Sequence, residues 1–198
     1  MKKVILSILC MCMMLTLFGC GKEEEEVFYE TTLSFDKDGK IADVIVESFS
    51  EAYYSEDGLK AYFQEKISDF NSGNINSGDV TLSDLAVDNG VARATLKFDS
   101  SDAYTRFYGT PTFYGTINDA YDKGYITETV LKSVESNDTL SKIDLMGRKD
   151  DTIIIVGEVV RVHTPKKVTF TSANVEVLGE KDVRISSDSS GMAYILLK

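Results

Sequence analysis

The chain lacks most of the residues on which metal and disulfide chemistry depend. Its 198 residues include one histidine, no tryptophan and three cysteines. Cys10 and Cys12 lie in an apolar N-terminal run, so a chain that loses this run keeps only Cys20. One thiol forms no internal disulfide, and one imidazole cannot supply the three or four nitrogen or sulfur ligands of a typical zinc site. We therefore expect no metal and no disulfide framework.

Recognisable catalytic and cofactor motifs are also missing. A Ser-His-Asp triad would have to use His163, the only histidine, and no Gly-x-Ser-x-Gly sequence presents a serine. Gly73 and Gly78 have the spacing of a phosphate-binding loop, but Asp79-Val80 follows where Lys and Ser or Thr are required. We expect no cofactor, and no catalytic residue can be named.

Basic side chains are scarce. The full chain has 21 Lys and Arg against 32 Asp and Glu, and without residues 1–19 the balance is 19 against 32, a net charge of −13. Nucleic-acid binding depends on basic contacts to phosphate, and attachment to anionic lipid depends on basic clusters. The charge argues against both and indicates a self-repelling, soluble surface.

The long apolar run stands at the N-terminus. Lys2 and Lys3 precede Val4–Phe18, which is shorter than the roughly 20 residues needed to cross a bilayer. A short basic segment followed by an apolar run is typical of a secretory signal. The run ends at Leu17-Phe18-Gly19-Cys20, and Glu23–Glu26 follow.

These residues resemble the signal peptide of bacterial lipoproteins, in which an aliphatic residue and two small residues precede an invariant cysteine. Leu17, Gly19 and Cys20 match that pattern. The resemblance implies that residues 1–19 are removed and that Cys20 carries a diacylglyceryl group, which anchors the chain at the extracytoplasmic face of the cell membrane. Residues 20–26 then form an acidic tether. The alternative is an ordinary secretory leader that leaves Cys20 as a free thiol, a liability in an oxidising compartment.

The rest of the sequence predicts an α+β fold. Strands over Tyr29–Phe35 and Ile41–Phe49 flank a turn at Asp36–Gly39, and a second hairpin turns at Asn89-Gly90, with a bulge in its first strand. Between the hairpins, Ser55 caps a helix that ends near Gly73. The apolar residues of this helix recur at helical spacing and are expected in the core: Leu59, Tyr62, Phe63, Ile67 and Phe70.

The C-terminal third is β-rich. Ile153–Val156 is a continuous apolar run that suits a strand buried on both faces, and four further short strands with period two follow it. We predict antiparallel hairpins packed on one long and several short helices, followed by a C-terminal antiparallel β-meander. Residues 27–135 form the α+β part and residues 136–198 the β-rich part, as lobes of one domain or as two units.

Aromatic residues are concentrated in the middle of the chain, where Phe-Tyr-Gly-Thr occurs at 107–110 and again at 113–116. Tyrosine and phenylalanine on glycine-rich connections can form rigid binding surfaces. The candidate binding surface comprises Tyr104, Phe107, Tyr108, Phe113, Tyr114, Tyr121 and Tyr125. If these rings bind a ligand, several of them line one groove; alternatively, they pin two short helices onto the sheet.

Four segments resemble parts of uncharacterised small lipoproteins from clostridia-type Gram-positive bacteria. They are Phe113–Thr116, Thr164–Val168, Ser172–Val175 and Ala193–Leu196. That resemblance implies a location but no activity. We expect a non-enzymatic module that binds a protein, peptide or glycan. The alternatives are a cell-wall or glycan hydrolase that uses paired carboxylates, and a small solute-binding lipoprotein.

Overall fold

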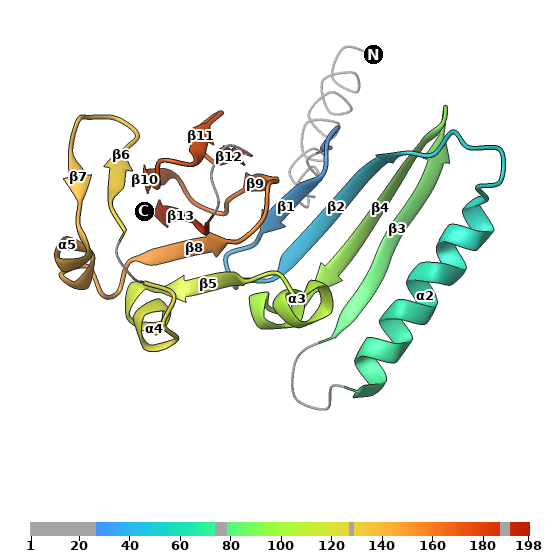
Figure 1. The fold of residues 1–198 in the computed structure, drawn as a ribbon, viewed down its shortest axis with the longest axis horizontal. Coiled ribbons are helices and arrows are strands. Elements are labelled where there is room, and N and C mark those ends of the chain that lie inside the picture. Colours follow the sequence, from blue (N-terminus) through green and yellow to red (C-terminus); the bar gives the residue numbers. More distant parts are fainter. Residues whose placement is uncertain (1–26, 74–78, 127–128, 187–190) are drawn as a thin grey trace, which may run out of the picture.

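The computed structural model describes residues 27–73, 79–126, 129–186 and 191–198. The expected signal peptide over residues 1–19, Cys20 and the rest of the acidic tether lie outside the described residues. Within them, four helices and two sheets make an α+β fold, as the sequence predicts. Figure 1 shows the long helix α2 at one end of the molecule and the second sheet at the other.

The first sheet has seven strands in the order β11-β12-β9-β1-β2-β4-β3. Its strands are β1 (Thr32–Phe35), β2 (Ile41–Ser48), β3 (Val80–Asp88), β4 (Val91–Phe98), β9 (Arg161–His163), β11 (Val175–Val177) and β12 (Asp182–Ile185). Neighbouring strands are antiparallel except for β1 and β9, which run parallel. The parallel pair joins the C-terminal part of the chain to the first hairpin.

The second sheet has six strands in the order β5-β8-β13-β10-β6-β7. Its strands are β5 (Thr112–Thr116), β6 (Leu131–Ser133), β7 (Thr139–Leu140), β8 (Thr152–Val156), β10 (Val168–Thr171) and β13 (Ala193–Leu197). Residues 27–135 and 136–198 therefore both contribute strands to both sheets. The expected division near residue 136 does not coincide with a division between the sheets.

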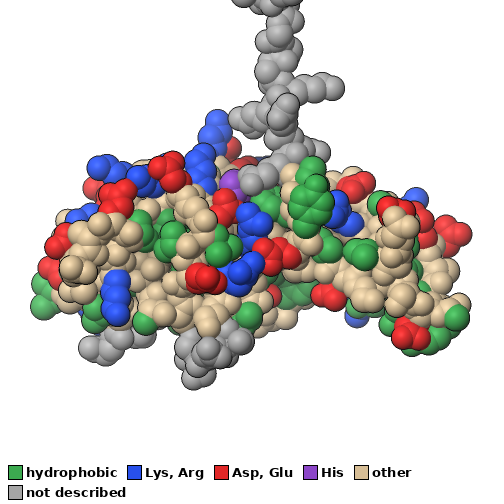
Figure 2. Space-filling model, turned by 90° about the horizontal axis from the view of Figure 1, so that it is seen from above, with side chains coloured by type: hydrophobic (Ala, Val, Ile, Leu, Met, Phe, Trp, Pro, Cys, Tyr) green, Lys and Arg blue, Asp and Glu red, His purple; other side chains and the backbone are tan. Residues whose placement is uncertain are grey.

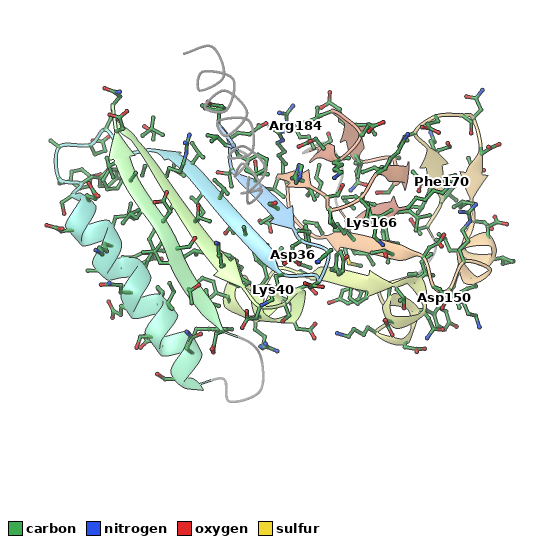
Figure 3. The ribbon with its side chains drawn as sticks, turned by 180° about the vertical axis from the view of Figure 1, so that it is seen from behind. Asp36, Lys40, Asp150, Lys166, Phe170 and Arg184 are labelled. Carbon is green, nitrogen blue, oxygen red and sulfur yellow. The ribbon has the colours of Figure 1, made fainter. Side chains whose placement is uncertain are left out.

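The turns of the two hairpins form as their sequences predict. The Asp36 Oδ1 atom accepts hydrogen bonds from the backbone N–H groups of Asp38 and Lys40 at 2.8 and 2.9 Å, and Asp36 and Lys40 lie together in Figure 3. Asn89 and Gly90 have φ angles of 50° and 75°, the left-handed conformation that a tight two-residue hairpin turn requires. The predicted bulge in β3 lies between Leu82 and Asp84.

The predicted long helix is α2 (Glu56–Gly73), and the Ser55 Oγ atom accepts the Gly58 N–H at 3.1 Å. Phe63 is buried against the first sheet, but Tyr62 is 54% exposed. The expectation that Tyr62 belongs to the core is wrong. Consecutive helical residues are about 100° apart around the axis, so Tyr62 points away from the direction in which Phe63 faces the sheet.

The two sheets and the helices enclose two apolar layers. The second sheet covers one end of the inner face of the first sheet, where Leu33, Ile41, Ile154 and Ile195 meet, and α2 and α3 (Ser101–Tyr108) cover the other end. Helices α4 (Ile117–Asp122) and α5 (Lys142–Met146) cover the far face of the second sheet. Strand β8 is thus buried on both faces, which confirms the prediction for Ile153–Val156.

The first described residues lie on the outer face of the first sheet, opposite the two helices. The Phe28 ring is buried, 5.6 Å from the His163 ring and 5.4 Å from the Arg161 guanidinium. The Glu30 carboxylate accepts two hydrogen bonds from Arg184 at 2.8 and 2.9 Å. Figure 2 shows the purple histidine among blue and red charged side chains, and Figure 3 labels Arg184.

Candidate functional site

Helix α3 brings three aromatic rings onto the first sheet. The Ser100 Oγ atom accepts the Ala103 N–H at 3.1 Å and caps the helix, and Gly109 ends it with a φ of 73°. Within the helix, Phe107 and Tyr108 lie three and four residues after Tyr104, so both are neighbours of Tyr104 on the helix surface, one on each side of it. Their ring centroids lie 5.0, 5.5 and 5.8 Å from that of Phe98 on β4.

A buried carboxylate lies beneath this helix. Asp43 is in phase with Ile41 and Ile45 on β2, and its neighbours across the sheet are Leu33 and Leu96. It is 3% exposed, and its Oδ2 atom accepts the Tyr108 hydroxyl at 2.7 Å. Burying an ionised carboxylate among leucines is costly unless hydrogen bonds compensate. Asp43 therefore stands out as a residue that packing alone does not explain.

A second carboxylate completes the arrangement. The Tyr104 hydroxyl donates to Glu158 Oε1 at 2.7 Å, and the ring centroids of Tyr104 and Tyr108 are 4.8 Å apart. Glu158 lies in the connection from β8 to β9, where the chain passes from the second sheet to the first. We call Asp43, Tyr104, Tyr108 and Glu158 the acid–tyrosine cluster.

The environment shifts the titration of all four groups. Burial raises the pKa of Asp43 to about 6; the hydrogen bond from Tyr108 opposes this rise, and the nearby Glu158 charge adds to it. Burial also raises the pKa of Glu158, against the hydrogen bond from Tyr104. The pKa values of Tyr104 and Tyr108 rise because their hydroxyls are shielded from water close to the two carboxylates, although Tyr108 as a whole is 40% exposed. Both hydroxyls therefore stay protonated as donors.

An open aromatic groove adjoins the cluster, between α2 and α3. Its volume is about 290 Å³, and it is lined by Ile45, Tyr62, Phe63, Lys66, Phe70, Phe107 and Tyr108. The Phe70 and Phe107 rings meet edge to face at 5.3 Å, and the Lys66 Nζ atom lies 5.8 Å from the centre of the Tyr62 ring. Tyr108 belongs to both features, because its ring lines the groove and its hydroxyl bonds to Asp43.

The seven aromatic residues of the candidate binding surface do not line one groove. Tyr104 and Phe113 are 2% and 3% exposed, so neither offers a free face. Phe107 and Tyr108 line the aromatic groove.

The other three aromatic residues lie elsewhere. Tyr114 stacks on Phe35, and Tyr125 packs beside Phe113 in the second apolar layer. Tyr121 is exposed on α4, with Lys142 over its ring. Packing onto the sheets therefore explains part of the set, and only Phe107 and Tyr108 of the seven line the aromatic groove.

Sequence reasoning missed Asp43, Glu158 and the role of Tyr62. One signal for Asp43 was present, because an acid at a position in phase with Ile41 and Ile45 falls on the apolar face of an alternating strand. Glu158 carried no such signal, since its position depends on a passage between sheets that local patterns do not reveal. Tyr62 was indistinguishable from its apolar neighbours by spacing alone.

Two features are absent from the described part of the chain. Residues 27–73, 79–126, 129–186 and 191–198 contain no cluster of three or more His, Cys, Asp or Glu side chains arranged to hold a metal. Among the same residues, no helix has the length and apolar character needed to span a bilayer. Comparison with protein-family models, with curated proteins and with solved structures finds no match to this chain.

Proposed function

We propose that this chain is a lipoprotein, anchored through Cys20 at the extracytoplasmic face of the cell membrane, that binds a protein or peptide partner in the aromatic groove without catalysing a reaction. The pattern Leu17-Phe18-Gly19-Cys20 after a short apolar run supports the anchor. The observation that carries the binding proposal is the exposed Tyr62, which stands on a rigid helix beside the half-buried Phe70 and Phe107.

The groove suits an apolar or aromatic side chain. Its walls are mainly Phe and Tyr rings, and aromatic pairs that meet edge to face or offset contribute roughly 0.5–1.5 kcal/mol beyond their buried area. Its volume of about 290 Å³ accepts a single large side chain or a small ring. Lys66 adds a positive charge to the lining, which favours a partner with a carboxylate close to that side chain.

The acid–tyrosine cluster gives the groove a fixed wall. Because Tyr108 donates its hydroxyl hydrogen to Asp43, its ring is held in one orientation and its oxygen keeps lone pairs that can accept a hydrogen bond from a ligand. The neighbouring Tyr104 ring is held in the same way, because its hydroxyl donates to Glu158. A wall that is already ordered loses less conformational entropy on binding.

A glycan hydrolase is the second candidate, because the cluster contains two carboxylates with raised pKa values. A general acid in glycoside hydrolysis needs such a pKa, and a second carboxylate acts as nucleophile or base. Asp43, however, is 3% exposed and bonded to Tyr108. Release of reducing sugar from purified peptidoglycan, abolished by both Asp43→Asn and Glu158→Gln, would favour the hydrolase over the binding module.

The anchor is tested by mass spectrometry of the amino-terminal peptide from protein isolated in its native membrane. We expect this peptide to begin at Cys20 and to carry a diacylglyceryl mass. In the Cys20→Ser chain we expect the leader to stay uncleaved by the lipoprotein pathway. An unmodified Cys20 thiol on a processed chain would contradict the anchor.

The groove is tested by NMR titration of ring signals with two probes. N-acetyl-phenylalaninamide represents a peptide side chain, and an N-acetylglucosamine disaccharide represents a glycan. We expect the phenylalanine probe to shift the Tyr62 and Tyr108 signals, and Tyr62→Ser to weaken its binding by roughly 2- to 10-fold through loss of one aromatic contact. Tyr53→Ser is the matched control, because Tyr53 is also an exposed tyrosine and does not line the groove. A response to the disaccharide alone would assign the groove to glycans, and no response to either probe would remove the proposal.

A further inference from the structure

A second concave site lies on the outer face of the first sheet, directly behind the aromatic groove. Side chains of a strand alternate between the two faces, so Ala42 and Val44 point outward while Asp43 and Ile45 point toward α3. The outward side chains line a cavity of about 470 Å³. We call it the outer-face pocket, and its lining includes Val27, Phe28, Val44, Arg93, Thr95 and Lys97.

The outer-face pocket holds cationic groups without anionic partners. Arg93 and Lys97 stand two positions on either side of Thr95 on β4, so their side chains share the outer face. The Arg93 Nε atom is buried, and the described residues offer it no hydrogen-bond acceptor. Its guanidinium rests 5.6 Å from the Tyr29 ring, a contact that leaves its N–H donors free.

One acidic residue lines the same pocket. Asp84 lies there, yet neither Arg93 nor Lys97 forms an ion pair with it or with any other described residue. Buried donors in native structures nearly always have partners, so the buried, unpaired Arg93 Nε atom in a pocket that Lys97 also lines indicates a place for an anion. Thr95 and Ser34 add hydroxyl groups that can donate to the same anion.

The segment between Cys20 and Glu30 indicates which anion lies close to the outer-face pocket. Val27 lines the outer-face pocket, and Phe28 and Glu30 are fixed on the sheet by His163 and Arg184. Six residues, 21–26, separate Cys20 from Val27. The seven Cα–Cα steps from Cys20 to Val27 reach about 25 Å at most. A lipid on Cys20 therefore keeps Val27, at the edge of this pocket, within about 25 Å of the lipid-bearing residue at the membrane surface.

We propose that the outer-face pocket binds the phosphate group of a membrane lipid, which turns the outer face of the first sheet toward the bilayer and the aromatic groove away from it. This proposal rests on the proposed anchor at Cys20, because the tether supplies the proximity. The chain is acidic overall, so binding is local to Arg93 and Lys97. Since the groove occupies the opposite face of the sheet, it stays open to a partner outside the membrane.

The test uses the chain from residue 20, in which Cys20 is the sole cysteine, coupled through its thiol to a maleimide lipid in nanodiscs. This coupling works whether or not the cell lipidates Cys20, so the outcome is independent of the anchor test. The readout is the Arg93 Nε–H NMR signal. The probes are discs of phosphatidylglycerol, discs of a phosphate-free galactolipid, and inorganic phosphate added to the uncoupled chain.

We expect the Arg93 signal to move with phosphatidylglycerol and with inorganic phosphate, and to stay in place with the galactolipid. Lys97→Gln should weaken phosphate binding roughly 5-fold, the usual effect of one basic residue near an anionic surface. Lys132→Gln is the matched control, because Lys132 is also exposed and stands on the second sheet. Relaxation enhancement from a gadolinium-bearing lipid should be stronger at Val44 than at Ile45 and Tyr62.

Three results would overturn the proposal. A response to inorganic phosphate but not to phosphatidylglycerol would make this a site for a soluble anion. A signal that moves only when Glu23–Glu26 are replaced by serine would assign the pocket to the chain's own acidic segment. If no probe moves the Arg93 signal, and Lys97→Gln and Lys132→Gln do not differ in phosphate binding, the pocket does not bind an anion.

Discussion

The tetrapeptide Phe-Tyr-Gly-Thr occurs at residues 107–110 and at residues 113–116, and the two copies fold differently. The first copy ends helix α3, and the second lies in strand β5. In the first, Tyr108 donates to the buried Asp43 carboxylate at 2.7 Å; in the second, Tyr114 donates to the Lys37 carbonyl at 3.0 Å. Identical side chains thus serve a candidate binding site in one place and a turn in the other.

The surroundings decide between the two conformations. Before the first copy, Ser100 caps a helix in which Ala103 and Tyr104 are buried, and Gly109 ends that helix in the left-handed conformation. The second copy instead pairs with β8, from Thr112 opposite Val156 to Thr116 opposite Thr152. Four residues are too short to fix a conformation, so capping on one side and strand pairing on the other determine it.

The largest single loss of stability is expected when the phenylalanines of the two copies are removed. Phe113 is almost fully buried beneath α4, whereas Phe107 is half-buried at the groove. Phe113→Ala should lower the free energy of unfolding by about 3–5 kcal/mol through the cavity it leaves. Phe107→Ala should cost about half as much, because less apolar surface returns to water. Urea denaturation of both variants measures the difference, and equal losses would show that the two rings are equally packed.

Between pH 4 and pH 8, only the first copy should make stability depend on pH, because only its tyrosine bonds to an ionisable side chain. The folded-state pKa of Asp43 is raised to about 6, so the folded protein keeps this proton more readily than the unfolded chain. The stability that Asp43 contributes is fully present below about pH 4, falls as the pH rises through 6, and is constant above that. Asp43→Asn removes this dependence.

Relative to the unsubstituted chain, Asp43→Asn should therefore gain on the order of 3 kcal/mol in unfolding free energy between pH 4 and pH 7. Asn keeps the shape of Asp43 and can still accept the Tyr108 hydroxyl. Denaturant titrations at several pH values measure the difference between the two chains, which cancels the effect of the other carboxylates. Asp36→Asn is the control, since Asp36 lies in an exposed turn near the second copy. A flat difference for Asp43→Asn would show that Asp43 is not protonated in the fold at pH 5.

Local chemistry made much of the fold predictable. The turn at Asp36–Gly39, the Asn89-Gly90 hairpin, the helix that starts after Ser55 and the doubly buried strand at Ile153–Val156 each follow from cap, turn or periodicity rules that act within about ten residues. These elements are the ones that the structure confirms.

Rules that act within about ten residues could not predict how the residues of the candidate site come together. Asp43 and Glu158 are 115 positions apart in the sequence, and they share a cluster because the chain passes between sheets after Val156 and β9 then pairs in parallel with β1. Non-local packing also decides which rings of the candidate binding surface face solvent. Tyr104 and Phe113 are buried by strands and helices that sequence spacing did not place.

The glycines of the two copies should differ by less than the phenylalanines. A Cβ atom on Gly115 would lie 2.7 Å from Cζ of the buried Phe113 ring, so Gly115→Ala should cost about 1–3 kcal/mol through overpacking. Gly109 has open space around it but a φ of 73°, so Gly109→Ala should cost about 1 kcal/mol through backbone strain. Thermal unfolding of the two variants measures the gap. Gly109→Asn should recover part of the loss at position 109, because Asn tolerates this conformation, and should have no such advantage over Ala at position 115.

At pH 4 the smallest difference is expected between the two tyrosine hydroxyls, and this difference should grow as the pH rises. Tyr108→Phe removes the hydrogen bond that holds down the pKa of Asp43, so that pKa should rise further. The loss of unfolding free energy should be about 1 kcal/mol at pH 4, where Asp43 is protonated, and up to about 3 kcal/mol at pH 8, where a buried charge loses its donor. Tyr114→Phe removes a bond to a backbone carbonyl, so its loss of about 1 kcal/mol should be the same at both pH values. Equal pH profiles for the two variants would mean that the Tyr108 hydroxyl does not stabilise the Asp43 charge, and the acid–tyrosine cluster would then hold the groove wall by packing alone.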